Sequence, residues 1–235
     1  MRALPALVMA LAALVTAGCS GPPPSTSYFP LDAGHRWQYR QVSDFENATR
    51  EEEAVVITTL GQDDAGIGRA WHRRSESGVD YWLRADDTGI YRIASKSDNQ
   101  PEPVKDDKPR YVLKMPLATG TQWQAMTTAY LLRRRNEFPP EIRHSHAPVM
   151  MTYTLEAKGE AVETRAGRFT DCLRVVGRAA MKVFADPVIG FKDMPLTTTE
   201  WYCAGTGLVK LMREEPAQST FLVGGTLTME LEQWQ

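Results

Sequence analysis

The stretch VMMTYTLEAK, residues 149–158, decides the fold class, because apolar residues recur at every second position in it. The residues on one face of an extended chain are Val149, Met151, Tyr153, Leu155 and Ala157. A period of two is typical of a strand in an antiparallel sheet, with one face on the core and the other toward water. We therefore predict a half-buried strand here.

The same alternation continues along the chain. It is clear over residues 173–183 and 226–232, and weaker over 36–42, 54–60, 69–75, 81–85, 89–94, 111–115, 127–133, 197–203 and 208–213. Residues 61–68, 95–109 and 136–148 are rich in turn-forming residues and are predicted as loops. About twelve strands are expected, with little helix beyond the first residues. The predicted fold is all-β and mainly antiparallel, either a single sandwich or an open or closed barrel-like sheet.

An internal repeat suggests that two related halves build this sheet. PLDAGHRWQ at 30–38 matches PLATGTQWQ at 116–124, and both read P-L-x-x-G-x-x-W-Q. Trp82 and Thr88-Gly89 are echoed later by Trp201 and Thr206-Gly207. We predict one β domain over 28–235 with halves of about 28–110 and 111–235. Core packing is favoured for the tryptophans over an outward carbohydrate platform.

The first 18 residues have the shape of a signal peptide. Arg2 is followed by an uncharged, apolar run to Val15 and then by small residues, and the run is too short to span a bilayer. The end of this run, LVTAGC at 14–19, resembles the lipobox of bacterial lipoproteins. Thr16 departs from the leucine that is commoner at its place. An ordinary secretory signal with a chance cysteine is the alternative.

The lipobox resemblance implies cleavage before Cys19 and acyl chains, of the palmitate type, on that residue. Ser20 stands where an aspartate would retain such a lipoprotein in the inner membrane, which favours the periplasmic face of the outer membrane. Residues 19–27 then form the lipidated cysteine and a short proline-rich tether. The expected membrane contact is through the acyl chains, without a membrane-spanning helix.

Three further segments are similar to uncharacterised bacterial lipoproteins. They are the stretch from Tyr28 to Tyr39, the stretch AGRFTDCL at 166–173 and the stretch WYCAGTGLVK at 201–210. This resemblance spans most of the mature chain and implies a β fold. It implies no activity.

The two remaining cysteines are expected to form a disulfide. Cys172 and Cys203 are an even pair in an oxidising compartment. If they face each other in a hairpin, its turn is centred near residues 187 and 188, within the turn-like stretch DPVIG at 186–190. Two free, half-buried thiols are the alternative.

No catalytic constellation is apparent. The chain contains no G-x-S-x-G, P-loop or dinucleotide-binding pattern, and the adjacent aspartates at 63–64, 86–87 and 106–107 are interpreted as turn residues. His144 and His146, with Met150 and Met151 nearby, are weak candidates for copper ligands. A solvated loop is the favoured interpretation of that segment, and no cofactor is expected.

Charge excludes one class of partner. The net charge of −2 argues against nucleic acid binding, which needs a concentrated basic face. The basic run at 133–135 is interpreted as a solvated strand end, with a phosphate or lipid-headgroup contact as the alternative.

The first functional hypothesis is a non-enzymatic envelope lipoprotein that binds an envelope protein or a cell-wall component. The alternatives are a carrier of a hydrophobic ligand in a β cavity, and a copper-binding protein or enzyme that uses the His144/His146 loop.

Overall fold

The computed structural model describes residues 26–135 and 146–235, with the backbone alone at 185 and 186. These residues form strands and turns without any helix, and so contain no helical membrane span. The strands are β1 (Arg36–Phe45), β2 (Arg50–Asp63), β3 (Ala70–Ser75), β4 (Asp80–Asp86), β5 (Gly89–Lys96), β6 (Val104–Lys114), β7 (Gln122–Thr127), β8 (Arg133–Arg134), β9 (Val149–Thr164), β10 (Gly167–Asp186), β11 (Gly190–Cys203), β12 (Gly207–Glu215), β13 (Leu222–Val223) and β14 (Gly225–Trp234).

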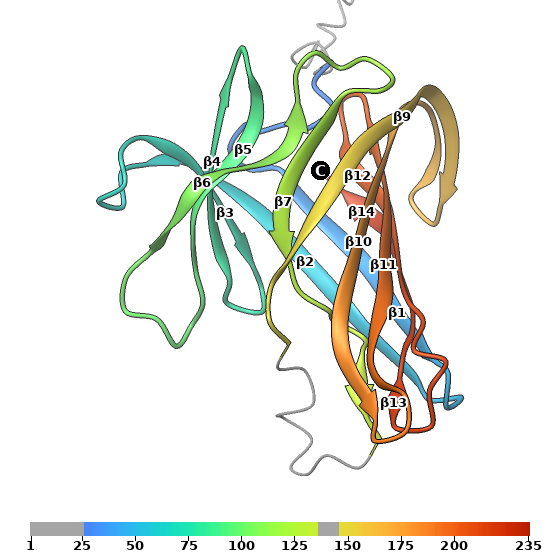
Figure 1. The fold of residues 1–235 in the computed structure, drawn as a ribbon. Coiled ribbons are helices and arrows are strands. Elements are labelled where there is room, and N and C mark those ends of the chain that lie inside the picture. The colour runs from blue at the N-terminus through green and yellow to red at the C-terminus, as the bar shows by residue number, and fades with distance from the viewer. Residues whose placement is uncertain (1–25, 136–145) are drawn as a thin grey trace, which may run out of the picture.

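Twelve of the strands form one antiparallel sheet that curls nearly into a barrel (Figure 1). The strand order is β6-β5-β4-β3-β2-β1-β14-β12-β11-β10-β9-β7, and β8 pairs separately with β13. The edge strands β6 and β7 contact each other without a backbone ladder, and Arg110 Nε donates to the Met126 carbonyl across the seam at 3.3 Å. The all-β, antiparallel prediction is confirmed, and the sheet is barrel-like.

The repeated motif builds the same turn in both places. Gly34 and Gly120 have φ of 92° and 91°, a region that favours glycine. Each donates its N–H at 2.8 Å to a carbonyl of the neighbouring strand, Gly34 to Thr59 and Gly120 to Leu155. Three residues later each motif places a buried tryptophan on a strand, Trp37 on β1 and Trp123 on β7. These side chains pack in the core, as does Trp82, whereas Trp201 is half-buried.

The alternation predicted over 149–158 appears directly in the burial of β9. Met151 and Leu155 are fully buried, while Met150 on the opposite face is exposed. The inward residues pack against Leu173 and Val175 of β10 in the largest core cluster. Burial of such aliphatic side chains contributes about 1.5–3 kcal/mol each.

Three local predictions were wrong. The strand predicted over 127–133 ends at Thr127, and residues 128–132 are irregular. The loop predicted over 95–109 is much shorter, because β5 continues to Lys96 and β6 begins at Val104. Asp106 is therefore a strand residue, and it pairs with Arg92 of β5. Asp63 and Asp86 are the last residues of β2 and β4, and Asp86 accepts hydrogen bonds from Thr88 in the turn that follows.

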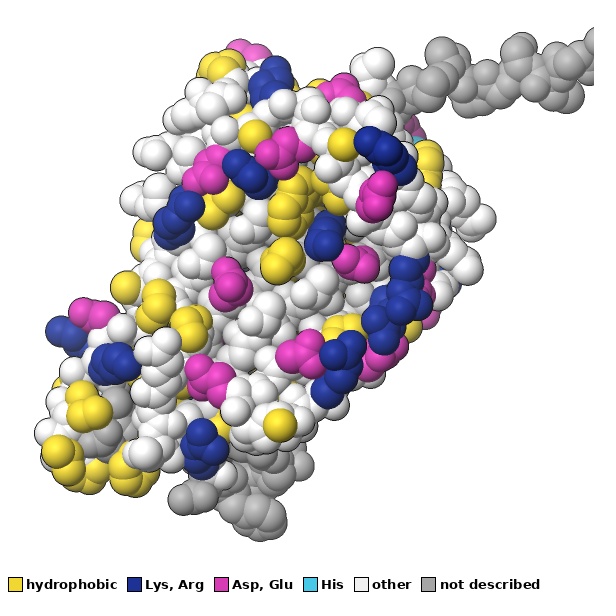
Figure 2. Space-filling view, turned by 90° about the vertical axis from the view of Figure 1, so that its right-hand side faces the viewer, with side chains coloured by type: hydrophobic (Ala, Val, Ile, Leu, Met, Phe, Trp, Pro, Cys, Tyr) yellow, Lys and Arg dark blue, Asp and Glu magenta, His cyan; other side chains and the backbone are white. Residues whose placement is uncertain are grey.

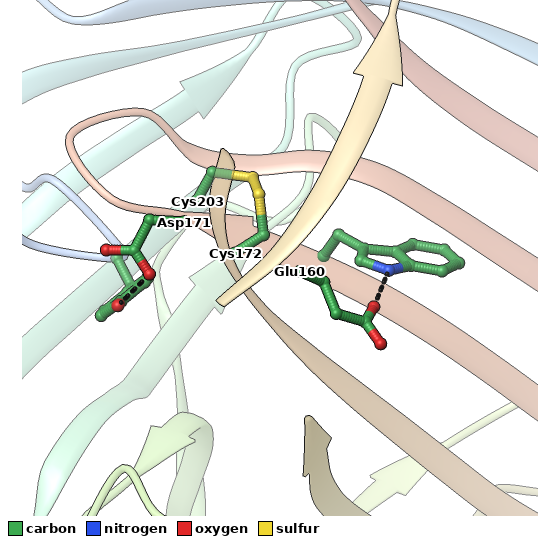
Figure 3. Close-up of a disulfide and its surroundings, with 6 residues drawn as sticks. Glu160, Asp171, Cys172 and Cys203 are labelled. Atoms are coloured by element: carbon green, nitrogen blue, oxygen red, sulfur yellow. Dashed lines mark hydrogen bonds between the residues drawn. A yellow bond between two sulfur atoms is a disulfide. The ribbon is translucent and has the colours of Figure 1, made fainter. Parts of the chain in front are cut away.

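The long hairpin of β10 and β11 carries the disulfide (Figure 3). Cys172 lies opposite Cys203 in the ladder, and a disulfide joins them. The hairpin turn covers 187–189, which is where the sequence places it. Both cysteines are buried beneath the β9–β10 turn, which curls over β14 and donates from Ala166 N–H to the Leu231 carbonyl at 3.0 Å.

Candidate functional site

An irregular segment, residues 128–132, crosses the inside of the barrel between its front and back strands (Figure 1). The Glu215 carboxylate at the end of β12 holds it by accepting the backbone N–H groups of Tyr130, Leu131 and Leu132 at 2.8–3.1 Å. A buried carboxylate needs such donors because burial removes its water shell. The backbone N–H groups of this segment thus bind one side chain of a strand distant in the sequence, where those of a strand would bind a neighbouring strand.

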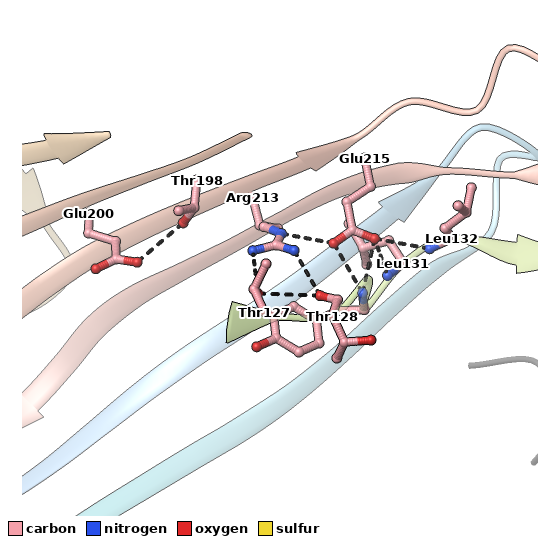
Figure 4. Close-up of polar contacts among 9 residues, drawn as sticks. Thr127, Thr128, Leu131, Leu132, Thr198, Glu200, Arg213 and Glu215 are labelled. Carbon is pink, nitrogen blue, oxygen red and sulfur yellow. Dashed lines mark hydrogen bonds and ion pairs between the residues drawn. The ribbon is translucent and has the colours of Figure 1, made fainter. Parts of the chain in front are cut away.

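Arg213 completes this arrangement (Figure 4). Its Nε donates to Glu215 at 2.8 Å, and its Nη2 donates to the Thr128 carbonyl at 2.9 Å. The guanidinium also lies over the ring of Tyr130, 4.8 Å from its centroid. Arg213 and Glu215 are two residues apart on β12 and therefore point to the same face of the sheet. Together they fix the start of the crossing segment.

The other end of the segment is fixed by Arg133. Its two terminal nitrogens donate to the two carboxylate oxygens of Glu51 on β2, at 2.7 and 2.8 Å. Its guanidinium also lies over the Phe45 ring, 3.9 Å from the centroid. Paired N–H···O bonds of this kind set orientation as well as distance. The basic run at 133–135 therefore begins with a residue engaged inside the molecule, and not with a solvated strand end.

A cavity of about 530 Å³, open to solvent, lies between this segment and strands β1, β2, β12 and β14. Its lining residues are Gln41, Ser43, Glu51, Glu53, Thr128, Ala129, Tyr130, Leu131, Arg133, Leu211, Arg213, Leu227 and Met229. The volume is in the range of small-molecule sites. The lining combines aliphatic side chains from β12 and β14 with carboxylates from β2 and two guanidinium groups. This arrangement can hold a molecule that has both an apolar and a polar part.

A second buried carboxylate, that of Glu200 on β11, lies close enough to Arg213 to feel its charge. Glu200 accepts a hydrogen bond from the Tyr202 hydroxyl at 2.5 Å and a longer one from Thr198 at 3.4 Å. Burial raises the pKa of Glu200. The Tyr202 hydrogen bond and the positive charges of Arg110 and Arg213 oppose that shift only in part. The pKa of Tyr202 is raised well above its usual value by burial and by the neighbouring Glu200 carboxylate.

Arg73 is a buried cation that the sequence gives no means of locating. It donates to the Pro30 carbonyl and to the Thr59 hydroxyl, and its guanidinium lies over the rings of Phe29 and Trp37. Burial lowers the pKa of Arg73 to about 10. The residue ties the first P-L-x-x-G-x-x-W motif to β3.

His72 forms a further cluster that sequence reasoning missed. Its Nδ1 lies 2.8 Å from Asp63 and its Nε2 lies 2.7 Å from Asp80. The ring stacks on Trp82, whose Nε1 donates to Asp63 at 2.6 Å. These residues come from β2, β3 and β4, so no local spacing in the sequence reveals their proximity.

The sites predicted from sequence are only partly within the described residues. Cys19 and His144 lie outside them. The Nε2 of His146 lies 2.6 Å from the Leu132 carbonyl, at the crossing segment. Met150 and Met151 point to opposite faces of β9, so both thioethers cannot face one ion. Across 26–135 and 146–235, no cluster of three His, Cys, Asp or Glu side chains has metal-binding geometry.

Comparisons with known proteins give two similar folds and no family. No protein-family model matches the chain, and no curated protein matches it. One similar solved structure is described as a "putative lipoprotein" from Parabacteroides distasonis, with a TM-score of 0.40 and 12% identity over 90% of this chain and 99% of that one. Another is described as a "putative exported protein with YmcC-like fold" from Bacteroides fragilis, with a TM-score of 0.38 and 12% identity over 88% and 98% of the two chains. Likenesses this distant assign no family to the chain.

Proposed function

We propose that this chain is a lipid-anchored lipoprotein of the bacterial envelope that acts as a non-enzymatic binding module on the periplasmic face of the outer membrane. The leader over residues 1–18, the lipobox ending at Cys19 and the short tether support the anchor. Ser20 supports the outer membrane as its destination. The disulfide between Cys172 and Cys203 suits an oxidising compartment.

The cavity inside the barrel is the observation that carries the binding role. Leu211, Leu227 and Met229 give it an apolar wall, and Glu51 and Arg133 give it charge. Glu51 and Arg133 pair with each other, and the Glu51 side chain is still 50% exposed. A wholly hydrophobic cargo would remove the remaining water from this pair without adding a polar contact, which is unfavourable. The proposed ligand is therefore a small amphiphile, with its apolar part on β12 and β14 and its polar part toward β2.

The anchor is tested by labelling cells with palmitate and by mass spectrometry of the mature amino terminus. We expect a diacylglyceryl-modified Cys19 as the first residue and loss of label in a Cys19→Ser variant. The variant should also fail to fractionate with outer membranes. An unmodified amino terminus in the wild-type protein would contradict the proposal, as would a Cys19→Ser variant that still fractionates with membranes.

The cavity is tested with the amphiphilic dye 8-anilinonaphthalene-1-sulfonate. Ser43 lines the cavity, so Ser43→Phe fills it and should weaken dye binding by about tenfold or more. Leu60→Phe adds the same ring at an exposed position outside the cavity and serves as the matched control. Equal dye affinity in both variants, with unchanged thermal unfolding, would show that the dye binds elsewhere and would contradict the cavity assignment. Native mass spectrometry of protein purified from envelopes then identifies the co-purifying molecule.

A further inference from the structure

The turn between β10 and β11 carries an unusual group of exposed apolar side chains, which we call the apolar tip: Phe184, Val188, Ile189 and Phe191. Their exposed fractions are 38%, 94%, 62% and 68%. Phe184 and Phe191 face each other across the last rungs of the ladder, with ring centroids 5.6 Å apart. Hairpin turns are usually polar, and clustered exposed apolar side chains mark interaction sites.

The space-filling view shows these side chains gathered at one extremity of the molecule (Figure 2, lower left). The sheet consists of only two strands there, β10 and β11, so the apolar tip is a convex protrusion. A protrusion with apolar side chains pointing outward on several sides can enter a bilayer interface, where every side chain finds hydrocarbon. It lacks the flat shape of a typical protein contact surface.

Basic side chains flank the apolar tip. Lys182 precedes it on β10 and Lys192 follows it on β11, while Asp193 lies opposite Lys182 in the ladder. Arg135 lies at the same end of the barrel, beside Phe221, another exposed apolar residue. Residues 182–193 contain two aspartates, Asp186 and Asp193, so the formal charges of this stretch cancel and Arg135 is the additional cation near the tip. A cation close to a bilayer contributes attraction to anionic headgroups.

The apolar tip and the start of the described chain lie at opposite ends of β11. The strand begins at Gly190 beside the tip and ends at Cys203, and Gly205 just beyond it donates to the Ser27 carbonyl. Its 14 residues span roughly 45 Å at about 3.3 Å per residue. Residue 27 therefore leaves the barrel at the end far from the tip.

We propose that the apolar tip inserts into the headgroup region of a lipid bilayer, and that this bilayer is not the one that holds the amino terminus. Insertion itself rests on the exposed apolar side chains of the tip and on its convex shape. The involvement of a second bilayer rests on the proposed anchor at Cys19. An anchored molecule would then bring two membrane surfaces together, with the cavity between them.

Insertion is tested with the full chain purified from envelopes and carrying an environment-sensitive NBD dye at a Val188→Cys substitution. Vesicles of phosphatidylethanolamine and phosphatidylglycerol should shift the dye emission to the blue, and nitroxide lipids should quench it. Changing Phe184 and Phe191 together to serine should weaken this response by about tenfold or more. A Leu60→Ser change, at an apolar residue that is 52% exposed elsewhere, should leave it intact.

No emission change at saturating lipid would overturn the proposal, including the case in which the apolar tip binds only a protein. Bridging is measured separately, as clustering of protein-bearing vesicles with bare vesicles by light scattering. If Cys19 is not acylated, clustering is lost but the dye at position 188 still responds to vesicles. Failure of the anchor and failure of tip insertion are thus distinguishable.

Discussion

Arg213 Nε donates to the Glu215 carboxylate at 2.8 Å, and both side chains are almost completely buried. A buried pair of this kind is costly to disrupt on one side only, because the remaining charge loses its partner without regaining water. The Glu215 carboxylate also accepts hydrogen bonds from the backbone N–H groups of residues 130–132. The crossing segment therefore depends on one carboxylate.

We predict that Glu215→Gln lowers the free energy of unfolding by about 3–5 kcal/mol. Glutamine keeps the shape but leaves Arg213 uncompensated and gives the three amides a weaker acceptor. Urea denaturation measures the change. Glu232→Gln removes the half-buried partner of the exposed Arg165 and should cost less than about 1 kcal/mol. Similar costs for the two variants would contradict the structural role of Glu215.

The Cys172–Cys203 disulfide closes a loop with a sequence separation of 31. We predict that changing both cysteines to alanine lowers the free energy of unfolding by about 3–4 kcal/mol, chiefly because the unfolded chain gains conformational freedom. Denaturant unfolding with and without reductant checks this. Reductant should destabilise the wild-type protein and leave the double variant unchanged.

Glu200 gives a pH dependence whose sign follows from burial. Its pKa is raised in the folded protein, so its contribution favours folding when the carboxyl is protonated and is lost as pH rises through the folded pKa. Glu200→Gln, which can still accept from the Tyr202 hydroxyl, should therefore be more stable than wild type at neutral pH. The difference should shrink as the pH falls through the raised folded pKa, and it should vanish below the ordinary glutamate pKa. Thermal unfolding of both proteins at several pH values measures this difference. A stability advantage of Glu200→Gln that grows in acid would contradict a raised pKa for Glu200.

Gly34 and Gly120 allow the two copies of the repeated motif to be compared. An added Cβ meets nothing within 4 Å at either glycine, so only the positive φ makes alanine unfavourable. We predict that Gly34→Ala and Gly120→Ala each cost about 1–2 kcal/mol. Chemical denaturation of both variants measures this. A cost at one position and none at the other would argue against equivalent turns.

The sequence predicts those parts of the fold that are encoded locally. Alternation identifies β9 because its inward residues, from Met151 to Leu155, recur every two positions. The spacing of Cys172 and Cys203 also locates the β10–β11 turn, since pairing in a hairpin constrains its centre. The repeated motif similarly marks the turns that precede Trp37 and Trp123.

The candidate site could not be predicted in the same way, because it depends on contacts between distant residues. Residues 128–132 continue the alternation of β7, and nothing local shows that their amides bind Glu215, more than 80 residues away. Asp106 was misassigned because β6 is an edge strand with largely exposed side chains, so its polar composition resembles a loop. Glu51 and Arg133 meet only when the barrel has formed.

The seam between β6 and β7 determines how the barrel can change its circumference. A closed barrel widens only by breaking backbone hydrogen bonds along a whole strand. Here the only hydrogen bond described across the seam comes from the Arg110 side chain to the Met126 carbonyl, so the circumference can increase while every backbone ladder stays intact. The two edge strands can therefore move apart without disturbing the ladder between β1 and β14, which lies in the middle of the strand order.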